Sequence, residues 1–365
     1  MDFQQRMQSE FYLVHEKLAH LLEAASKVCY QGGQVRGGIL SRDKALDVLV
    51  QRLQGAGARA RGINVRSEHS PYLIQARTRS DKLAPERREG SEAFIWEEKK
   101  QGIVYLLSCS ERQNFERLSS KIERYLSPHL SRIFLRTSEI RSALNRLTED
   151  SKGLSLRVRE YTSRSLIDDP GSHKRVRTNR EWTDEDHKSV FQKLSAQREW
   201  LSALRLDVRG RGLASGKIRR DSTFSCARGF RYFFRTVVAT VSDAVVRSRD
   251  FLGKRDQQSH PERFARALKI EYAQPVFSDK RQNGRLVQTL KGMRNSALSV
   301  FHPNPYLHAS LIDYADGSSY EIWVTTPTSI LLLPKRKATT GSIERVCDFI
   351  CDKFQEGEIK DFPGK

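Results

Sequence analysis

The sequence lacks long apolar runs. None of its hydrophobic stretches approaches the ~18 residues that a helix needs to cross a bilayer. The opening residues, Met-Asp-Phe-Gln-Gln, contain no basic stretch leading into an apolar core, so no secretory signal is predicted. The five cysteines are scattered and form no Cys-x-x-Cys pair, which argues against a disulfide framework. We therefore expect a soluble, cytoplasmic protein with no membrane partner.

The signatures of common catalytic sites are also missing. A Walker phosphate-binding loop needs a glycine five residues before its Gly-Lys pair and a Ser or Thr after it. Here Arg211 occupies the first place before Gly216-Lys217, and Ile218 follows the pair. No hydrophobic strand leads in as a dinucleotide fingerprint requires, and no Gly-x-Ser-x-Gly elbow is present. We expect no cofactor, no metal site and no catalytic residues.

Two segments keep a metal-dependent nuclease open as an alternative, because such enzymes hold Mg²⁺ with carboxylates. Glu97 and Glu98 begin two Glu-x-Lys pairs, with Asp81 upstream. They lie at a predicted hairpin turn, where charged residues are expected in any case. The second segment clusters imidazole, amide and carboxylate side chains: His302, Asn304, His308, Asp313 and Asp316. Prolines interrupt it, so a turn between a helix and a strand is the preferred interpretation.

The sequence has few acidic residues relative to basic ones. Lys and Arg number 64 against 44 Asp and Glu, which gives a formal net charge of +20. Arginine, whose planar fork can bind a phosphate through two hydrogen bonds, exceeds lysine by 43 to 21. Residues 201–300 hold 21 basic and 8 acidic residues, whereas residues 301–365 hold 7 and 9. This excess favours a polyanionic partner, and its concentration in one segment indicates a single cationic face.

The candidate binding segment is rich in arginine and glycine. Glycines at 210 and 212 would let the backbone approach a phosphate that neighbouring cations neutralise. Aromatic residues over 230–234 would stack on exposed bases, or else belong to the core. A second basic cluster lies over 173–180, in a polar stretch. The predicted nucleic-acid-binding residues are Arg209, Arg211, Lys217, Arg219, Arg220, Arg228, Arg231, Arg235, Lys174, Arg175 and Arg177.

These patterns predict a non-catalytic protein that binds nucleic acid through its phosphates. DNA is favoured over RNA, and duplex over single strand. Little base specificity is expected, because a phosphate carries no sequence information. A basic scaffold that docks on an acidic protein is a further hypothesis, and a protein partner or a homo-oligomer stays open. Without a visible active site, the chain would serve as a subunit of a larger DNA-processing or antiviral defence complex.

The hydrophobic patterns predict an α+β fold with two domains, each with helices packed on a mostly antiparallel sheet. The predicted boundaries are 1–164 for the N-terminal domain, 165–182 for a basic linker or loop, and 183–365 for the C-terminal domain. The elements of the last domain are expected in the order β-α-β-β-β-α. The same patterns predict helices over 4–29, 183–204, 230–253 and 285–300, a helix capped by Ser41, a hairpin over 92–109 and a loop over 209–222.

Overall fold

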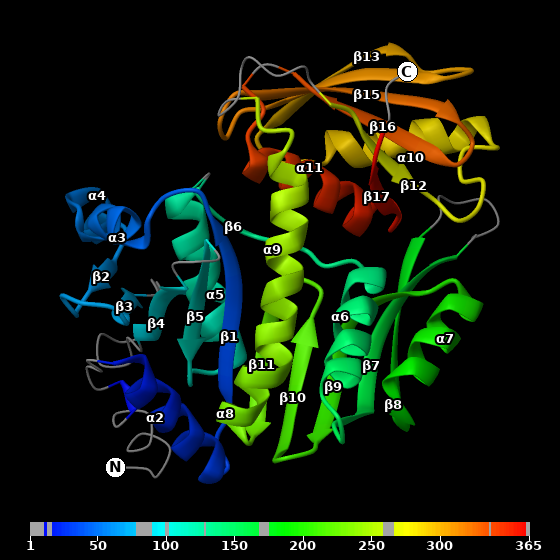
Figure 1. Ribbon diagram of the computed structural model, residues 1–365. Coiled ribbons are helices and arrows are strands. Elements are labelled where there is room, and N and C mark those ends of the chain that lie inside the picture. Colours follow the sequence, from blue (N-terminus) through cyan, green and yellow to red (C-terminus); the bar gives the residue numbers. More distant parts are fainter. Residues whose placement is uncertain are drawn as a thin grey trace, which may run out of the picture. The chain divides into compact units, whose positions relative to one another are not determined.

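The computed structural model describes residues 11–12, 17–77, 90–98, 102–127, 129–167, 175–257, 266–335 and 337–362. It has an α+β fold with two sheets (Figure 1). The chain divides into two compact units. Unit 1 comprises Met1–Ser163, Arg180–Gln197 and Leu201–Val246, and unit 2 comprises Arg164–Asn179, Arg198–Trp200 and Arg247–Lys365. Among the described helices, none is both long and apolar enough to cross a membrane.

Most of the larger sheet belongs to unit 1, and only the end of β7, the beginning of β8 and the first residue of β9 belong to unit 2. Its strands are β1 (Val35–Arg42), β2 (Ile63–Val65), β3 (Tyr72–Arg77), β4 (Gly90–Glu98), β5 (Ile103–Ser108), β6 (Leu130–Arg132), β7 (Ser155–Ile167), β8 (Arg175–Asp186), β9 (Trp200–Arg209), β10 (Leu213–Arg219) and β11 (Thr223–Arg228). They follow the order β2-β3-β4-β5-β1-β11-β10-β9-β7-β8, with β6 paired to β1. The helices are α2 (Leu18–Tyr30), α3 (Leu46–Gln54), α4 (Ala56–Ala60), α5 (Arg112–Leu126), α6 (Thr137–Asp150), α7 (His187–Gln197), α8 (Phe230–Phe233), the π-helical turn η2 (Phe234–Val238) and α9 (Ala239–Gly253).

Helices cover the two faces of this sheet unequally. Side chains alternate along a strand, so Ile218 of β10 is buried on one face while Lys217 lies on the other. On the first face, Ile218 joins one core with residues of α2 and α6 to α9. A second core lies on the opposite face, where α3, α4 and α5 cover the β1–β5 end. Among the described helices of unit 1, only α3, α4 and α5 contribute residues to the core on this face. Over β9, β10 and β11, polar side chains line the face instead.

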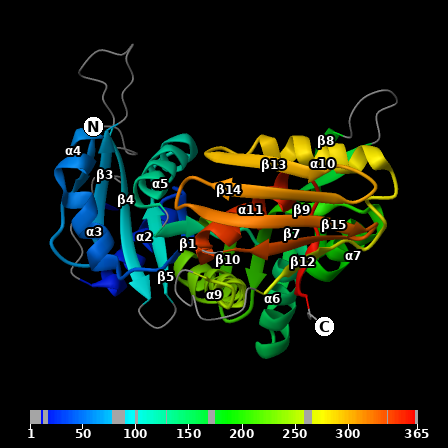
Figure 2. The ribbon, with the colours of Figure 1, turned by 90° about the horizontal axis from the view of Figure 1, so that it is seen from above.

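Unit 2 contains the smaller sheet. Its elements are β12 (Leu268–Glu271), α10 (Lys280–Lys291), β13 (Ser296–His302), β14 (Leu307–Asp313), β15 (Ser318–Thr326), β16 (Ser329–Pro334), α11 (Thr340–Lys353) and β17 (Glu358–Asp361). The strands follow the order β13-β14-β15-β16-β12-β17. Buried residues of α10 and α11, such as Leu286 and Ile343, share a core with Ile270 and Ile322 of the sheet. Figure 2 shows this sheet spread across the two helices.

Local backbone geometry corrects three helix predictions. Ser41 lies within β1 and caps no helix. Instead, α3 begins at Leu46, whose backbone amide donates to the Glu97 carboxylate over 3.0 Å. The helix predicted over 183–204 is α7, which ends before Arg198 because that residue has a φ of 57°. The helix predicted over 285–300 ends at Lys291, and β13 follows Asn295, whose φ is 55°.

The remaining element predictions are confirmed in some places and differ from the structure in others. The β4–β5 hairpin and the helix over 230–253 are confirmed. Of the helix predicted over 4–29, the described residues are helical at Phe11 and over 18–29, and α2 extends one residue further, to Tyr30. The described parts of the predicted linker belong to β7 and β8, while residues 168–174 lie outside the described residues. The observed order in unit 2 is β-α-β-β-β-β-α-β. In the larger sheet, β9, β10 and β11 join β1 through pairs such as Val35↔Cys226, so strands from both sides of the predicted linker form one sheet.

Candidate nucleic-acid interface

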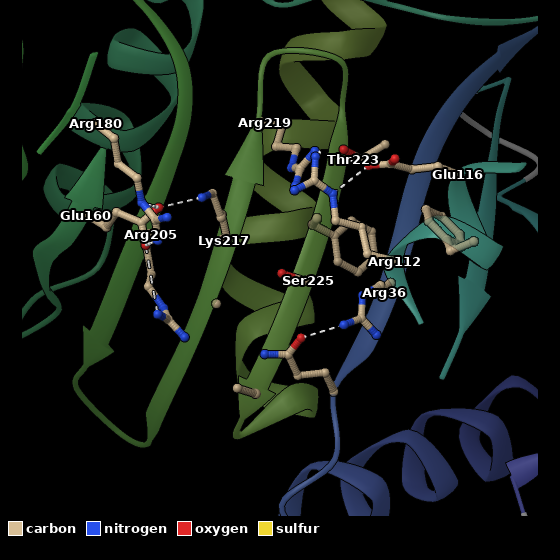
Figure 3. Close-up of a pocket in the computed structure, with 15 residues that line it drawn as sticks. Arg36, Arg112, Glu116, Glu160, Arg180, Arg205, Lys217, Arg219, Thr223 and Ser225 are labelled. Atoms are coloured by element: carbon tan, nitrogen blue, oxygen red, sulfur yellow. Dashed lines mark hydrogen bonds and ion pairs between the residues drawn. The ribbon is translucent and has the colours of Figure 1, made fainter. Parts of the chain in front are cut away.

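A hollow of about 220 Å³ lies on the open face of the unit 1 sheet (Figure 3). Its floor includes Gly216 and Ser225 of β10 and β11. Two carboxylates, Glu116 and Glu160, also line it. The cations that line it come from β1, α5, β8, β9 and β10: Arg36, Arg112, Arg180, Arg205, Lys217 and Arg219. Six positive and two negative charges leave the hollow with a formal net charge of +4.

Strand register creates part of this arrangement. Lys217 of β10 is paired with Arg205 of β9 on one side and with Ser225 of β11 on the other. Ser225 is in turn paired with Arg36 of β1. Directly paired residues of antiparallel strands point to the same face, so the row Arg205, Lys217, Ser225 and Arg36 crosses four strands. It places three cations and a hydroxyl group side by side on the open face.

Glu160 organises the first group of cations. Its side chain is only 2 % exposed, and its carboxylate lies 2.7 Å from Lys217 Nζ, 2.9 Å from Arg180 Nε and 4.0 Å from Arg205 Nη1. Burial acts to raise the pKa of Glu160, but the hydrogen bonds and charges of Arg180 and Lys217 outweigh it and leave the pKa below its ordinary value. The ionised carboxylate therefore holds three cations at one wall of the hollow.

A second group lies across the floor from the first, on the far side of Ser225 (Figure 3). Glu116 of α5 accepts from Arg112 Nε over 2.7 Å and lies 3.4 Å from Arg219 Nη1. Arg36 Nη1 donates to the Ser110 carbonyl oxygen over 2.7 Å. The hollow thus contains two cation groups, each of which is only partly neutralised by one carboxylate.

We expect Glu160→Gln to lower the free energy of unfolding by about 1–2 kcal/mol at neutral pH. Removing one partner of a buried ion pair costs about 3–5 kcal/mol, but Arg180 is 57 % exposed and can return to water, which reduces the loss. Because folding lowers the pKa of Glu160, its contribution is present above about pH 4.3, its unfolded-state pKa, and is lost as the pH falls through the folded-state value.

Denaturant unfolding of both proteins at neutral pH and below about pH 4 checks this expectation. The stability difference should be present at neutral pH and should shrink in acid. Equal stabilities at neutral pH would show that Glu160 does not hold the cations as described.

No protein-family model matches the chain. No curated protein sequence matches it either. The function must therefore be argued from the chemistry of the hollow.

The hollow contains only two of the predicted binding residues, Lys217 and Arg219. Arg220, also among the predicted binding residues, is only 4 % exposed and lies against the Phe134 ring. Arg177 is exposed on β8, in a stretch that belongs to unit 2. Arg175 is also in β8, and Lys174 lies outside the described residues. The remaining predicted cations are exposed but do not line the hollow: Arg209, Arg211, Arg228, Arg231 and Arg235.

The aromatic residues of this segment follow the core alternative, and its glycines lie against aromatic side chains. Phe230 and Phe233 are fully buried in the core and are not available to stack on bases. The predicted loop over 209–222 is largely β10 and its turns. A Cβ on Gly210 would lie 2.7 Å from the Tyr232 hydroxyl oxygen, and one on Gly212 would lie 3.0 Å from the Tyr232 ring. The absence of a side chain at these glycines therefore leaves room for the aromatic ring of Tyr232.

The segments that suggested a nuclease have structural partners. Glu97 pairs with Arg42 over 2.9 Å, in addition to its bond to the start of α3. Asp81 lies outside the described residues. Asp313 accepts from Arg345 over 2.7 Å, and the His308 ring stacks on Trp323 at 3.5 Å. Within the described ranges, no three His, Cys, Asp or Glu residues converge as a metal site requires.

Proposed function

We propose that the protein binds nucleic acid without catalysing a reaction, and that the hollow in unit 1 holds phosphates of the backbone. The observation that carries this proposal is the convergence of six cations from five separate elements on one open face, with a formal excess of four positive charges. Five of the six are arginines, whose planar donors match phosphate oxygens. Ser225 adds a hydroxyl group that can donate to the same oxygens.

The lining of the hollow favours nucleic acid over an acidic protein. Interfaces between proteins have an apolar, aromatic centre, whereas nucleic-acid interfaces are more polar and more positive. Only three of the lining residues have apolar side chains, and two of these, Phe115 and Phe224, are buried. Direct contacts would therefore come mainly from cations, hydroxyl groups and backbone.

Within this proposal we favour DNA over RNA, and a role as a subunit of a larger DNA-processing or defence complex. The five cysteines are all free and buried, which suits work in a reducing cytoplasm. Phosphodiester chemistry is common to DNA and RNA, so both belong in the test.

The salt dependence of binding tests the proposal. Displacement of counterions by about four net charges gives a slope of about −2.8 to −3.6 for log K against log salt, or about a 50- to 150-fold loss of affinity between 50 and 200 mM salt. Fluorescence anisotropy with labelled DNA and RNA oligonucleotides of mixed sequence measures the slope. No binding at the lower salt concentration, together with co-purification of an acidic protein, would reject the proposal in favour of a scaffold.

A further inference from the structure

An exposed tryptophan lies beside the hollow. Trp182 is 63 % exposed and lies on β8, at the end of the described strand order of the unit 1 sheet. It follows Arg180 by two residues, so the two side chains share one face of the strand. The Arg180 guanidinium lies over the indole ring, 4.9 Å from its centroid, and also binds Glu160. The ring is thereby held next to a cation that lines the hollow.

This exposure distinguishes Trp182 from the other tryptophans. Trp96 and Trp200 are buried, and Trp323 is partly buried beneath its stack with His308. Single exposed aromatic side chains are common on protein surfaces, but this ring is held beside a charged hollow by a cation of the hollow's lining, and this combination points to a ligand. The ligand must present a flat aromatic surface next to anionic groups.

We propose that Trp182 stacks on an unpaired base of a single strand whose phosphates occupy the hollow. This inference rests on the proposed function and specifies its substrate as single-stranded nucleic acid, in place of the duplex favoured from sequence. Bases in a duplex are stacked on both sides by their neighbours, and a side chain reaches a base face only after the base is unstacked. A single strand offers such faces freely, and every base has one, so the contact tolerates any sequence.

The experiment compares three probes of one mixed sequence: a single strand, its duplex, and an abasic single strand that keeps the phosphates but carries no bases. Affinities of the wild type and Trp182→Ala are measured by anisotropy at one salt concentration. Tyr30→Ala is the matched control, because Tyr30 is 94 % exposed on α2, which packs on the other face of the sheet.

Trp182→Ala should weaken binding of the single strand about 5- to 100-fold and change duplex binding by less than about twofold. The wild type should lose a similar factor on the abasic strand, and Trp182→Ala should no longer distinguish the abasic strand from the normal one. Trp182→Phe should keep most of the affinity, since it keeps an aromatic face. Tyr30→Ala should bind like the wild type.

Two results overturn the inference in different ways. If Trp182→Ala binds all three probes like the wild type, or weakens all three equally, base stacking on Trp182 is excluded while the phosphate-binding function stands. If the wild type binds none of the probes, the proposed function fails, and the stacking role fails with it.

Discussion

Replacement of Arg180, Arg205 and Arg219 by glutamine should weaken single-stranded nucleic acid binding about 100- to 500-fold at about 0.1 M salt. These arginines come from β8, β9 and β10 and line both walls of the hollow. Each lost phosphate contact lowers the salt slope by about 0.7–0.9, which for three contacts corresponds to about two to three decades of affinity at this salt concentration. Glutamine removes the charge without adding the repulsion that a carboxylate would introduce. Anisotropy titrations measure the change.

A matched variant separates the position of the charges from their number. Arg141 and Arg146 of α6 and Lys188 of α7 are also exposed, and both helices pack on the other face of the sheet, in the core that contains Ile218. Their replacement by glutamine removes the same three charges and should change the affinity by less than about threefold. Equal losses in the two triple variants would mean that net charge, and not the hollow, attracts the ligand.

Gly216→Ala should lower the free energy of unfolding by about 2–3 kcal/mol. The new Cβ would lie 2.5 Å from the Phe233 ring and 2.7 Å from the Ser225 carbonyl oxygen. The ring is fully buried and the oxygen belongs to the paired strand β11, so neither can move without disturbing the sheet. Chemical denaturation measures this loss of stability.

Gly284→Ala makes the same chemical change where the new Cβ meets no other atom, and it should raise the free energy of unfolding. Gly284 lies exposed inside α10, and its Cβ would meet no atom within 4 Å. Alanine should stabilise the helix by about 1 kcal/mol relative to glycine. An unchanged stability for Gly216→Ala would contradict the close packing of β10 on α8.

The fold class was accessible from sequence because the local signals were strong. Gly317, with a φ of 79°, turns β14 into β15 as the Asp-Gly pair predicts. The sequence of β9 also contains a local strand signal, because apolar and polar residues alternate: Leu204, Leu206 and Val208 are buried, and the intervening Arg205 is not. This period of two indicates a strand, and it could have replaced the prediction that a helix continues through Leu204.

The hollow itself was only partly accessible. Lys217 and Arg219 were predicted because they lie in the most basic segment, and Arg180 lies at the end of the second basic cluster. Arg36 and Arg112 lie far from both segments in the sequence and reach the hollow through the pairing of β1 with β11 and the packing of α5. Pairing over such sequence separations depends on tertiary structure, for which one sequence gives no local signal.

Mapping of arginine reactivity tests the central claim most directly. The protein is treated with phenylglyoxal with and without a bound single-stranded oligonucleotide, and modified arginines are located by mass spectrometry. Arg112 and Arg180 line the hollow and are exposed, so the ligand should protect them while Arg141 on α6 reacts as before. Protection confined to Arg209 and Arg211, with both hollow arginines still reactive, would contradict the assignment of the hollow as the phosphate-binding surface.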